Sequence, residues 1–264
     1  MSTLKLATNA LHAGHDVTTN GGTRAVPIYQ TSSYVFNNSE HAANLFSLKE
    51  LGFIYTRLNN PTNQILQDRL AAVEGGIGAV VFASGTAAIS TGLLTLLKAG
   101  DHIVASSSLY GGTYNLLSVT LPRFGITTTF VDASNPNNFE VAVQENTRAF
   151  FVESLGNPKL DVLDLEAISA HAKKAEVPFI VDNTVATPVL LNPIKHGADI
   201  VIHSLTKYIG GQGTSLGGAI VDAGTFNWAN GKFPEFTEPS AGYHGLKYYE
   251  TLGAASYTFK LILE

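Results

Sequence analysis

The chain contains the stretch His203-Ser204-Leu205-Thr206-Lys207-Tyr208, which directly follows an apolar run at 198–202 and precedes a glycine cluster at 210–213. An apolar run of this length between turn-forming residues predicts a buried strand. Lys207 then lies in the loop just after the strand, beside the hydroxyl groups of Ser204 and Thr206. This arrangement is suited to a lysine that holds an aldehyde cofactor as a Schiff base while the hydroxyls bind the cofactor's phosphate. Most lysines near turns are solvated surface charges, so the rest of the sequence must decide between the two interpretations.

Short apolar runs recur along the chain and predict a sheet. The predicted strands, besides the one before Lys207, are 79–83, 102–105, 127–131, 148–152, 178–182 and 218–221. Helices are expected at 64–73, 87–98, around 114–121, and at 165–174 after the N-cap Asp164. Strands that alternate with helices predict crossover connections. Most of these strands are apolar throughout. We therefore expect an α/β fold with a mainly parallel, seven-stranded sheet and helices on both faces.

Five polar residues fall at or shortly after the ends of the predicted strands, namely Ser84, Tyr110, Glu153, Asp182 and Lys207. If the strands are parallel, all five share the sheet edge at which α/β proteins bind ligands. The helix that opens at Ser84 favours a phosphate at its free N–H groups. Asp182 suits a protonated pyridine nitrogen, and Tyr110 suits stacking on an aromatic ring. The ordinary alternatives are a serine cap, an aspartate cap or ion pair, and a core tyrosine.

Composition favours a soluble, intracellular globular protein. The 264 residues are 45% hydrophobic and 14% charged, with a net charge of −5 and no cysteine. These values argue against disorder, disulfides, thiolate metal sites and nucleic-acid binding. We find no apolar stretch of signal-peptide or membrane-spanning character and no dinucleotide, P-loop or Gly-x-Ser-x-Gly motif. His12 and His15 lie in a predicted irregular segment, so no metal site is expected.

The two ends of the chain have less regular patterns. Residues 1–60 are predicted to form an irregular arm that covers its own core or reaches a neighbour. Residues 228–243, rich in proline, glycine and aromatic residues, are predicted to be a long surface loop or a binding loop. Residues 244–264 have a helical pattern without a stop signal, and the sequence is expected to be cut off there.

Five motifs in order carry a family resemblance. They are Ala83-Ser84-Gly85-Thr86-Ala87-Ala88, Leu109-Tyr110-Gly111-Gly112-Thr113, Glu153-Ser154-Leu155-Gly156-Asn157-Pro158, Asp182-Asn183-Thr184 and Ser204-Leu205-Thr206-Lys207-Tyr208. Through essentially its whole length, the chain resembles the trans-sulfuration (Cys/Met metabolism) family of pyridoxal 5'-phosphate enzymes, which have fold type I, the aspartate-aminotransferase type. The resemblance implies an N-terminal arm at 1–60 and a large cofactor-binding domain at 61–245. Residues 246–264 would begin the helix that leads to a C-terminal domain absent from this chain.

The resemblance also implies roles for individual residues. Lys207 would hold the cofactor and act as the catalytic base, and Tyr110 would stack on the ring and assist proton transfer. The other cofactor-binding residues would be Gly85, Thr86, Ser204 and Thr206 at the phosphate, Asp182 at the ring nitrogen and Asn157 near the ring hydroxyl. Tyr55 and Arg57 would cross to the phosphate of a neighbouring subunit in a cytoplasmic homotetramer. The C-terminal domain would supply the arginine for the substrate's carboxylate.

Within this family, the loop at 231–236 and the stretch at 243–246 are most similar to those of the O-acetylhomoserine sulfhydrylases. Methionine-cleaving lyases usually have a cysteine at the position of Gly112. The resemblance therefore implies γ-replacement on O-acetylhomoserine by sulfide or methanethiol, which gives homocysteine or methionine and releases acetate. Alternatives are a γ-lyase or cystathionine γ-synthase, or a cofactor-binding, oligomerising fragment without turnover.

Overall fold

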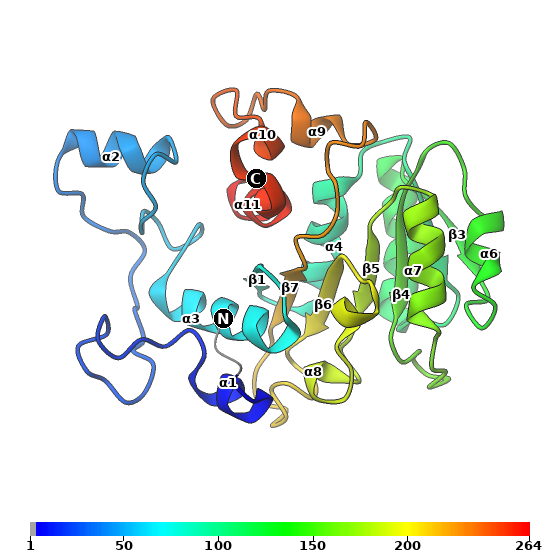
Figure 1. Cartoon of the computed structure of the whole chain (residues 1–264), viewed down its shortest axis with the longest axis horizontal. Coiled ribbons are helices and arrows are strands. Elements are labelled where there is room, and N and C mark those ends of the chain that lie inside the picture. Colours follow the sequence, from blue (N-terminus) through cyan, green and yellow to red (C-terminus); the bar gives the residue numbers. More distant parts are fainter. Residues whose placement is uncertain (1–3) are drawn as a thin grey trace.

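A seven-stranded sheet forms the centre of the protein in the computed structural model, which describes residues 4–264 (Figure 1). The spatial order is β1-β7-β6-β5-β4-β2-β3. The strands are β1 Gly78–Phe82, β2 His102–Ser106, β3 Thr127–Val131, β4 Thr147–Glu153, β5 Phe179–Asp182, β6 Ile200–Ser204 and β7 Gly218–Asp222. Only β7 runs against its neighbours, β1 and β6. The predicted α/β fold with a mainly parallel sheet of seven strands is thus confirmed.

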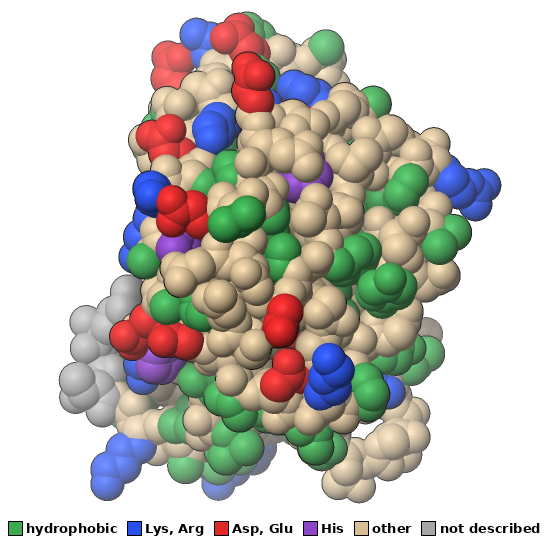
Figure 2. Space-filling model, turned by 90° about the vertical axis from the view of Figure 1, so that its right-hand side faces the viewer, with side chains coloured by type: hydrophobic (Ala, Val, Ile, Leu, Met, Phe, Trp, Pro, Cys, Tyr) green, Lys and Arg blue, Asp and Glu red, His purple; other side chains and the backbone are tan. Residues whose placement is uncertain are grey.

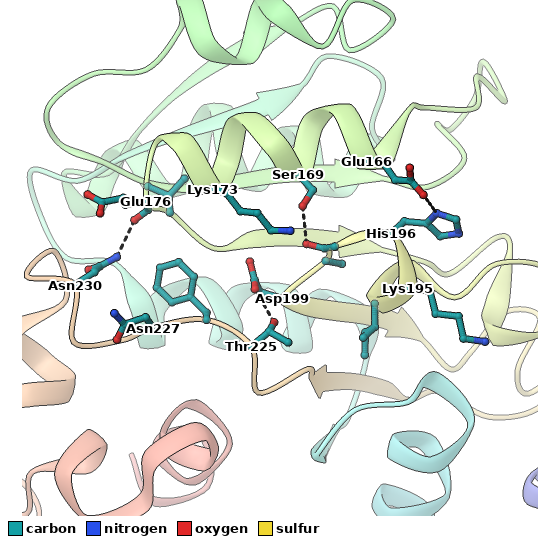
Figure 3. A pocket seen from close by; sticks show the side chains of 15 residues that line it. Glu166, Ser169, Lys173, Glu176, Lys195, His196, Asp199, Thr225, Asn227 and Asn230 are labelled. Atoms are coloured by element: carbon teal, nitrogen blue, oxygen red, sulfur yellow. Dashed lines mark hydrogen bonds and ion pairs between the residues drawn. The ribbon is translucent and has the colours of Figure 1, made fainter. Parts of the chain in front are cut away.

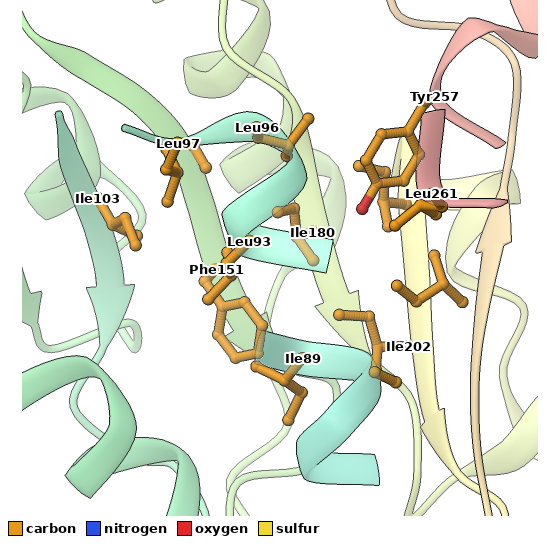
Figure 4. Packing of buried hydrophobic residues seen from close by; sticks show 14 of the residues in the cluster. Ile89, Leu93, Leu96, Leu97, Ile103, Phe151, Ile180, Ile202, Tyr257 and Leu261 are labelled. Carbon is orange, nitrogen blue, oxygen red and sulfur yellow. The ribbon is translucent and has the colours of Figure 1, made fainter. Parts of the chain in front are cut away.

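Helices cover both faces of this sheet. The helices are α1 Leu6–His12, α2 Ser39–Phe46, α3 Pro61–Glu74, α4 Gly85–Leu96, α5 Gly111–Asn115, α6 Asn137–Val141, α7 Leu165–Lys174, α8 Thr187–Leu190, α9 Pro234–Thr237, α10 Tyr248–Leu252 and α11 Ser256–Leu263. On one face, α4 and α11 pack against strand residues such as Phe151 and Ile202 (Figure 4). On the other face, α3 and α7 pack against Val152 and Val201. Alternate residues of each strand therefore enter different cores, as the pleat requires.

The N-terminal arm is more regular than predicted, because it contains α1 and α2. The prediction missed α2 although its cap is visible in the sequence: the Asn38 side chain accepts a hydrogen bond from the His41 amide. The helix buries only Leu45. Figure 1 shows α2 well away from the sheet, so little of its amphipathic surface contacts the rest of this chain.

The prediction of a surface loop at 228–243 was wrong. Trp228, Phe233 and Phe236 are almost completely buried. The Trp228 ring stacks on Phe236 and on Tyr257 of α11, with centroid separations of 4.4 and 5.4 Å. This segment is therefore part of the core that holds α11 against the sheet.

The predicted helix at 244–264 is interrupted. It consists of α10, a 3₁₀ turn at Gly253–Ala255 and α11. Gly253 has a φ of +54°, a conformation that ends a helix and favours glycine. The helix expected around 114–121 is α5, which continues through a π-helical and a 3₁₀ turn to Phe124.

The face beyond β3 and α6 carries side chains of both charges among apolar ones, without a field of a single sign (Figure 2). Among the helices of residues 4–264, none has the length and apolarity needed to cross a membrane.

Candidate functional site

A cavity of about 590 Å³ lies at the carboxyl ends of the parallel strands. It brings together all five strand-end residues predicted from the sequence: Ser84, Tyr110, Glu153, Asp182 and Lys207. Of the residues proposed from the resemblance, Gly85, Thr86, Asn157, Ser204 and Thr206 also line it. Leu155, Leu160, Val185 and Leu216 add apolar surface. The cavity thus combines a lysine amine, two carboxyl groups and several hydroxyls with an apolar wall.

The first turn of α4 forms one side of the cavity. Ser84 is its N-cap, and its Oγ accepts a hydrogen bond from the Ala87 amide at 3.1 Å. A Cβ atom at Gly85 would lie 2.6 Å from Cβ of Ser204, so only glycine allows the helix and the end of β6 to come this close. Within residues 4–264, the amides of Gly85 and Thr86 donate to no backbone or side-chain acceptor. The Ser204 hydroxyl and these amides therefore form a cradle suited to an anion.

Asp182 ends β5 at the floor of the cavity. Its Oδ1 accepts hydrogen bonds from the Thr184 amide at 3.0 Å and the Thr184 hydroxyl at 2.5 Å. These bonds close a local turn and do not make Asp182 a helix N-cap, the alternative considered from the sequence, because the next helix, α8, begins only at Thr187 after the N-cap Ala186. Burial raises the pKa of Asp182, and the hydrogen bonds from Thr184 only partly oppose this. A cationic group in the cavity would stabilise the ionised carboxylate.

Glu153 is the neighbour of Asp182 in the sheet, because the two residues are register partners across β4 and β5. Its Oε1 accepts a hydrogen bond of 2.6 Å from the Tyr110 amide. Burial, followed by the proximity of Asp182, raises the pKa of Glu153 to about 8. The sequence placed Glu153 at this edge but gave it no role; two strands that each end in an acidic residue were the available signal.

The loop after β6 carries Lys207 into the cavity. Its turn is closed by hydrogen bonds from the Lys207 amide to the Ser204 carbonyl and from the Gly210 amide to the Leu205 carbonyl. The Thr206 hydroxyl donates a hydrogen bond to the Gly217 carbonyl at 3.2 Å and accepts one from the Gly217 amide at 3.1 Å. Thr206 thus holds the loop while lining the cavity, and Ser204 presents its hydroxyl toward α4.

Tyr110 covers part of the cavity. Its side chain is half exposed, with 51% of the surface accessible. The ring lies so close to Gly112 that a Cβ atom there would be 2.4 Å from Cε1 of Tyr110. The absence of a side chain at Gly112 therefore determines where the Tyr110 ring can lie.

Two of the predicted residues lie elsewhere. Tyr55 and Arg57 line a shallow hollow in the arm together with Tyr29 and Thr31. They do not line the cavity that contains Lys207 of the same chain. Their predicted position at the phosphate of a neighbouring subunit stays a prediction.

A second cavity of about 580 Å³ lies at the opposite edge of the sheet (Figure 3). Size does not distinguish it from the first, but its chemistry does. Both Asp199 oxygens accept hydrogen bonds, from the Phe179 amide and the Thr225 hydroxyl. His196 pairs with Glu166 at 3.0 Å. These polar groups satisfy one another, so the cavity beside Lys207 is the better candidate for catalysis.

The residues of the Lys207 cavity fit pyridoxal phosphate. Lys207 provides an amine for the aldehyde, and the α4 cradle provides donors for the phosphate. Asp182 provides a buried carboxylate for the ring nitrogen, and the phenol of Tyr110 lies where a planar ring can stack. Within residues 4–264, no cluster of side chains has the composition of a metal site.

Comparisons with known proteins agree with this fit. The family model described as Cys/Met metabolism PLP-dependent enzyme matches residues 7–254. The O-acetyl-L-homoserine sulfhydrylase of Leptospira meyeri is 57% identical over 94% of this chain and 56% of its own length. O-acetyl-L-homoserine sulfhydrylase 1 of Thermus thermophilus is 49% identical over 97% of this chain and 62% of its own length.

One solved structure gives a matching fold. It is an O-acetylhomoserine (thiol)-lyase from Campylobacter jejuni with N'-pyridoxyl-lysine-5'-monophosphate. It is 40% identical, has a TM-score of 0.89, and the match covers 99% of this chain and 70% of that one. The chain spans roughly three-fifths of the length of the two sulfhydrylases named above. The fold, the cavity and the match over residues 7–254 together show that this chain belongs to the Cys/Met metabolism family of pyridoxal-phosphate-dependent enzymes.

Proposed function

We propose that this chain forms the cofactor-binding part of an enzyme that replaces the γ-substituent of O-acetylhomoserine with sulfide, giving homocysteine and acetate. Methanethiol in place of sulfide would give methionine. The convergence of Lys207, Asp182, Tyr110 and the α4 N-terminus in one cavity is the observation that carries the proposal. The names of the relatives, O-acetyl-L-homoserine sulfhydrylases among them, support this substrate.

Each group in the cavity has a proposed task. When bound, pyridoxal phosphate supplies an electron sink for the bonds at the substrate's Cα. The Lys207 amine would hold the cofactor and, when free, would take the substrate's Cα proton at Nζ. The α4 amides, Ser204 and Thr206 bind the phosphate, and Asn157 contacts the ring hydroxyl. Asp182 holds a proton on the ring nitrogen, and Tyr110 orients the ring.

A neighbouring subunit completes the proposed site. Tyr55 and Arg57 lie on the arm outside their own chain's cavity, which supports a role at the phosphate of a partner chain. The proposed assembly is a cytoplasmic homotetramer built from two such dimers. The arm at 1–60, the cofactor domain at 61–245 and the beginning of a linking helix at 246–264 are the corresponding units.

Two measurements test the proposal. The first adds pyridoxal phosphate, reduces the sample with borohydride and maps the modified peptide, with Lys207→Ala as the control; we expect an adduct on Lys207 alone. The second incubates the protein with O-acetylhomoserine and sulfide and measures acetate and homocysteine. Cleavage of methionine or cystathionine without these products would favour the lyase alternative. An adduct without any turnover would favour a cofactor-binding fragment.

A further inference from the structure

A buried carboxylate lies behind the site, on the other side of the sheet from the cavity. Glu74 is the last residue of α3 and is fully buried. Its Oε1 lies 2.5 Å from Nε2 of His203, which is also fully buried. His203 directly precedes Ser204, which lines the cavity. One side chain of α3 therefore holds the end of β6.

The same carboxylate oxygen also holds the end of β5. The amide nitrogen Nδ2 of Asn183 donates to Glu74 Oε1 at 3.3 Å and to the Leu191 carbonyl at 3.0 Å. Its Oδ1 accepts a hydrogen bond of 2.8 Å from the Ser154 hydroxyl, just after β4. Asn183 directly follows Asp182. The network thus connects Glu74 to the ends of three neighbouring strands.

The pleat of the sheet turns this network into a support for the cavity. Ile180 and Ile202 pack on the α4 face, whereas Val181 and Val201 pack on the α3 face. By the same alternation, Asp182 and Ser204 project to the α4 face, and the adjacent residues Asn183 and His203 project toward Glu74. Any shift of His203 or Asn183 relative to α3 therefore moves a cavity residue one peptide away.

Fold stability alone does not account for these polar groups. A buried pair of ionisable side chains stabilises a fold little compared with apolar side chains of similar volume, such as that of Leu70 in α3. In residues 4–264, Glu74 Oε2 and His203 Nδ1 are buried without a hydrogen-bond partner, an unfavourable arrangement for a purely structural contact. Burial raises the pKa of Asp182, and the proximity of His203 only partly opposes this.

We propose that Glu74 is a positioning residue, which fixes the ends of β5 and β6 so that Asp182 and Ser204 face the cofactor cavity. The expected effect on cofactor binding rests on the proposed function, but the role of Glu74 in fixing the ends of β5 and β6 does not. Hydrogen exchange in the cofactor-free protein tests this role directly. The amides to follow are those of Asn183, which donates to the Ile202 carbonyl, and Ser204, which donates to the Thr184 hydroxyl.

Glu74→Met keeps the side-chain volume and removes the acceptor. We expect both amides to exchange about tenfold faster, and the dissociation constant for pyridoxal phosphate to rise by a similar factor. Glu74→Gln retains an acceptor oxygen and should restore both values to within about threefold. Gln67→Met is the matched control: Gln67 is buried on the same helix, but its Oε1 accepts from the Val81 amide of β1. It should lower stability without changing these two amides.

The proposal would be overturned if the Asn183 and Ser204 amides exchanged as slowly in Glu74→Met as in the wild type. It would also be overturned if Gln67→Met accelerated their exchange as much as Glu74→Met does. Ser154→Ala, at the far end of the network, is the milder variant if Glu74→Met does not fold. It should accelerate exchange at Asn183 and leave the Val81 amide unchanged, and no acceleration would contradict the proposal. If the wild type binds no pyridoxal phosphate, the proposed function fails, while the exchange data still decide the role of Glu74.

Discussion

Two adjacent glycines at the edge of the cavity differ in what a side chain would meet. A Cβ atom at Gly112 would collide with the Tyr110 ring, whereas one at Gly111 would meet nothing within 4 Å. We expect Gly112→Ala to displace the Tyr110 ring and reduce kcat at least about tenfold, and Gly111→Ala to have little effect. Steady-state kinetics and crystal structures of both variants test this. A Gly112→Ala enzyme with the wild-type rate and ring position would contradict the expectation.

The pKa of Glu153 predicts a pH dependence of stability. Burial and Asp182 raise this pKa from 4.5 to about 8, so the folded protein holds the proton more tightly than the unfolded chain. The contribution of Glu153 is therefore fully present below pH 4.5 and is lost as the pH rises toward 8. The slope should not exceed about 1.4 kcal/mol per pH unit.

Glu153→Gln isolates this contribution from other buried carboxyl groups with raised pKa values, such as Asp182 and Asp199. Denaturant unfolding of the cofactor-free protein between pH 5 and 8 should show a smaller loss of stability in the variant than in the wild type. Glu166→Gln, at an exposed position, should match the wild type. Parallel curves for the wild type and Glu153→Gln would show that Glu153 is already ionised at pH 5.

At the scale of the element, the N-terminus of α4 resembles that of α7 in structure but differs in surroundings. Ser84 caps α4 by accepting from Ala87, and Asp164 caps α7 by accepting from Ala167. Only α4 opens into the cavity. The Ser84 cap leaves the amides of Gly85 and Thr86 for a phosphate.

Ser84→Ala and Asp164→Ala should each lower the free energy of unfolding by about 1 kcal/mol. Only Ser84→Ala should also weaken the binding of pyridoxal phosphate, because it loosens the turn that presents the cradle. Thermal unfolding and an absorbance titration separate the two effects. If both variants bind the cofactor as tightly as the wild type, the capped turn is not needed for the phosphate site.

At the scale of the whole molecule, the sequence predicted the sheet and the cavity better than the outer parts. Most of the strands are apolar throughout, and polar residues follow their ends, so the apolar runs located the sheet and the residues after them located the cavity. The segment at 228–243 was misjudged because glycine and proline indicate turns but not whether the aromatic residues between them are buried. The network of Glu74, His203 and Asn183 was missed because Asn183 lies 109 positions and His203 lies 129 positions from Glu74 in the sequence. No local pattern reports such contacts.

Exposed apolar residues on the arm are consistent with a partner that covers it. Ile28 and Val35 have 84% and 96% of their surface exposed, far more than core residues of the same type. Burial of such side chains in a dimer would contribute favourably to assembly. The arm also carries Tyr55 and Arg57, so the surface that would bind a partner and the residues proposed for the partner's site belong to the same segment.

Mixing two inactive variants tests this shared site. Arg57→Ala should impair the phosphate site of the partner, and Lys207→Ala should abolish the site of its own chain. In a mixed dimer, one site combines Lys207 from the first chain with Arg57 from the second. Random pairing of equal amounts should therefore restore about a quarter of the wild-type sites. Borohydride reduction and peptide mapping count the sites that load at a limiting cofactor concentration, which keeps the test independent of substrate choice. If mixing restores nothing while both variants remain folded and associated, Arg57 acts within its own chain or has no role at the site.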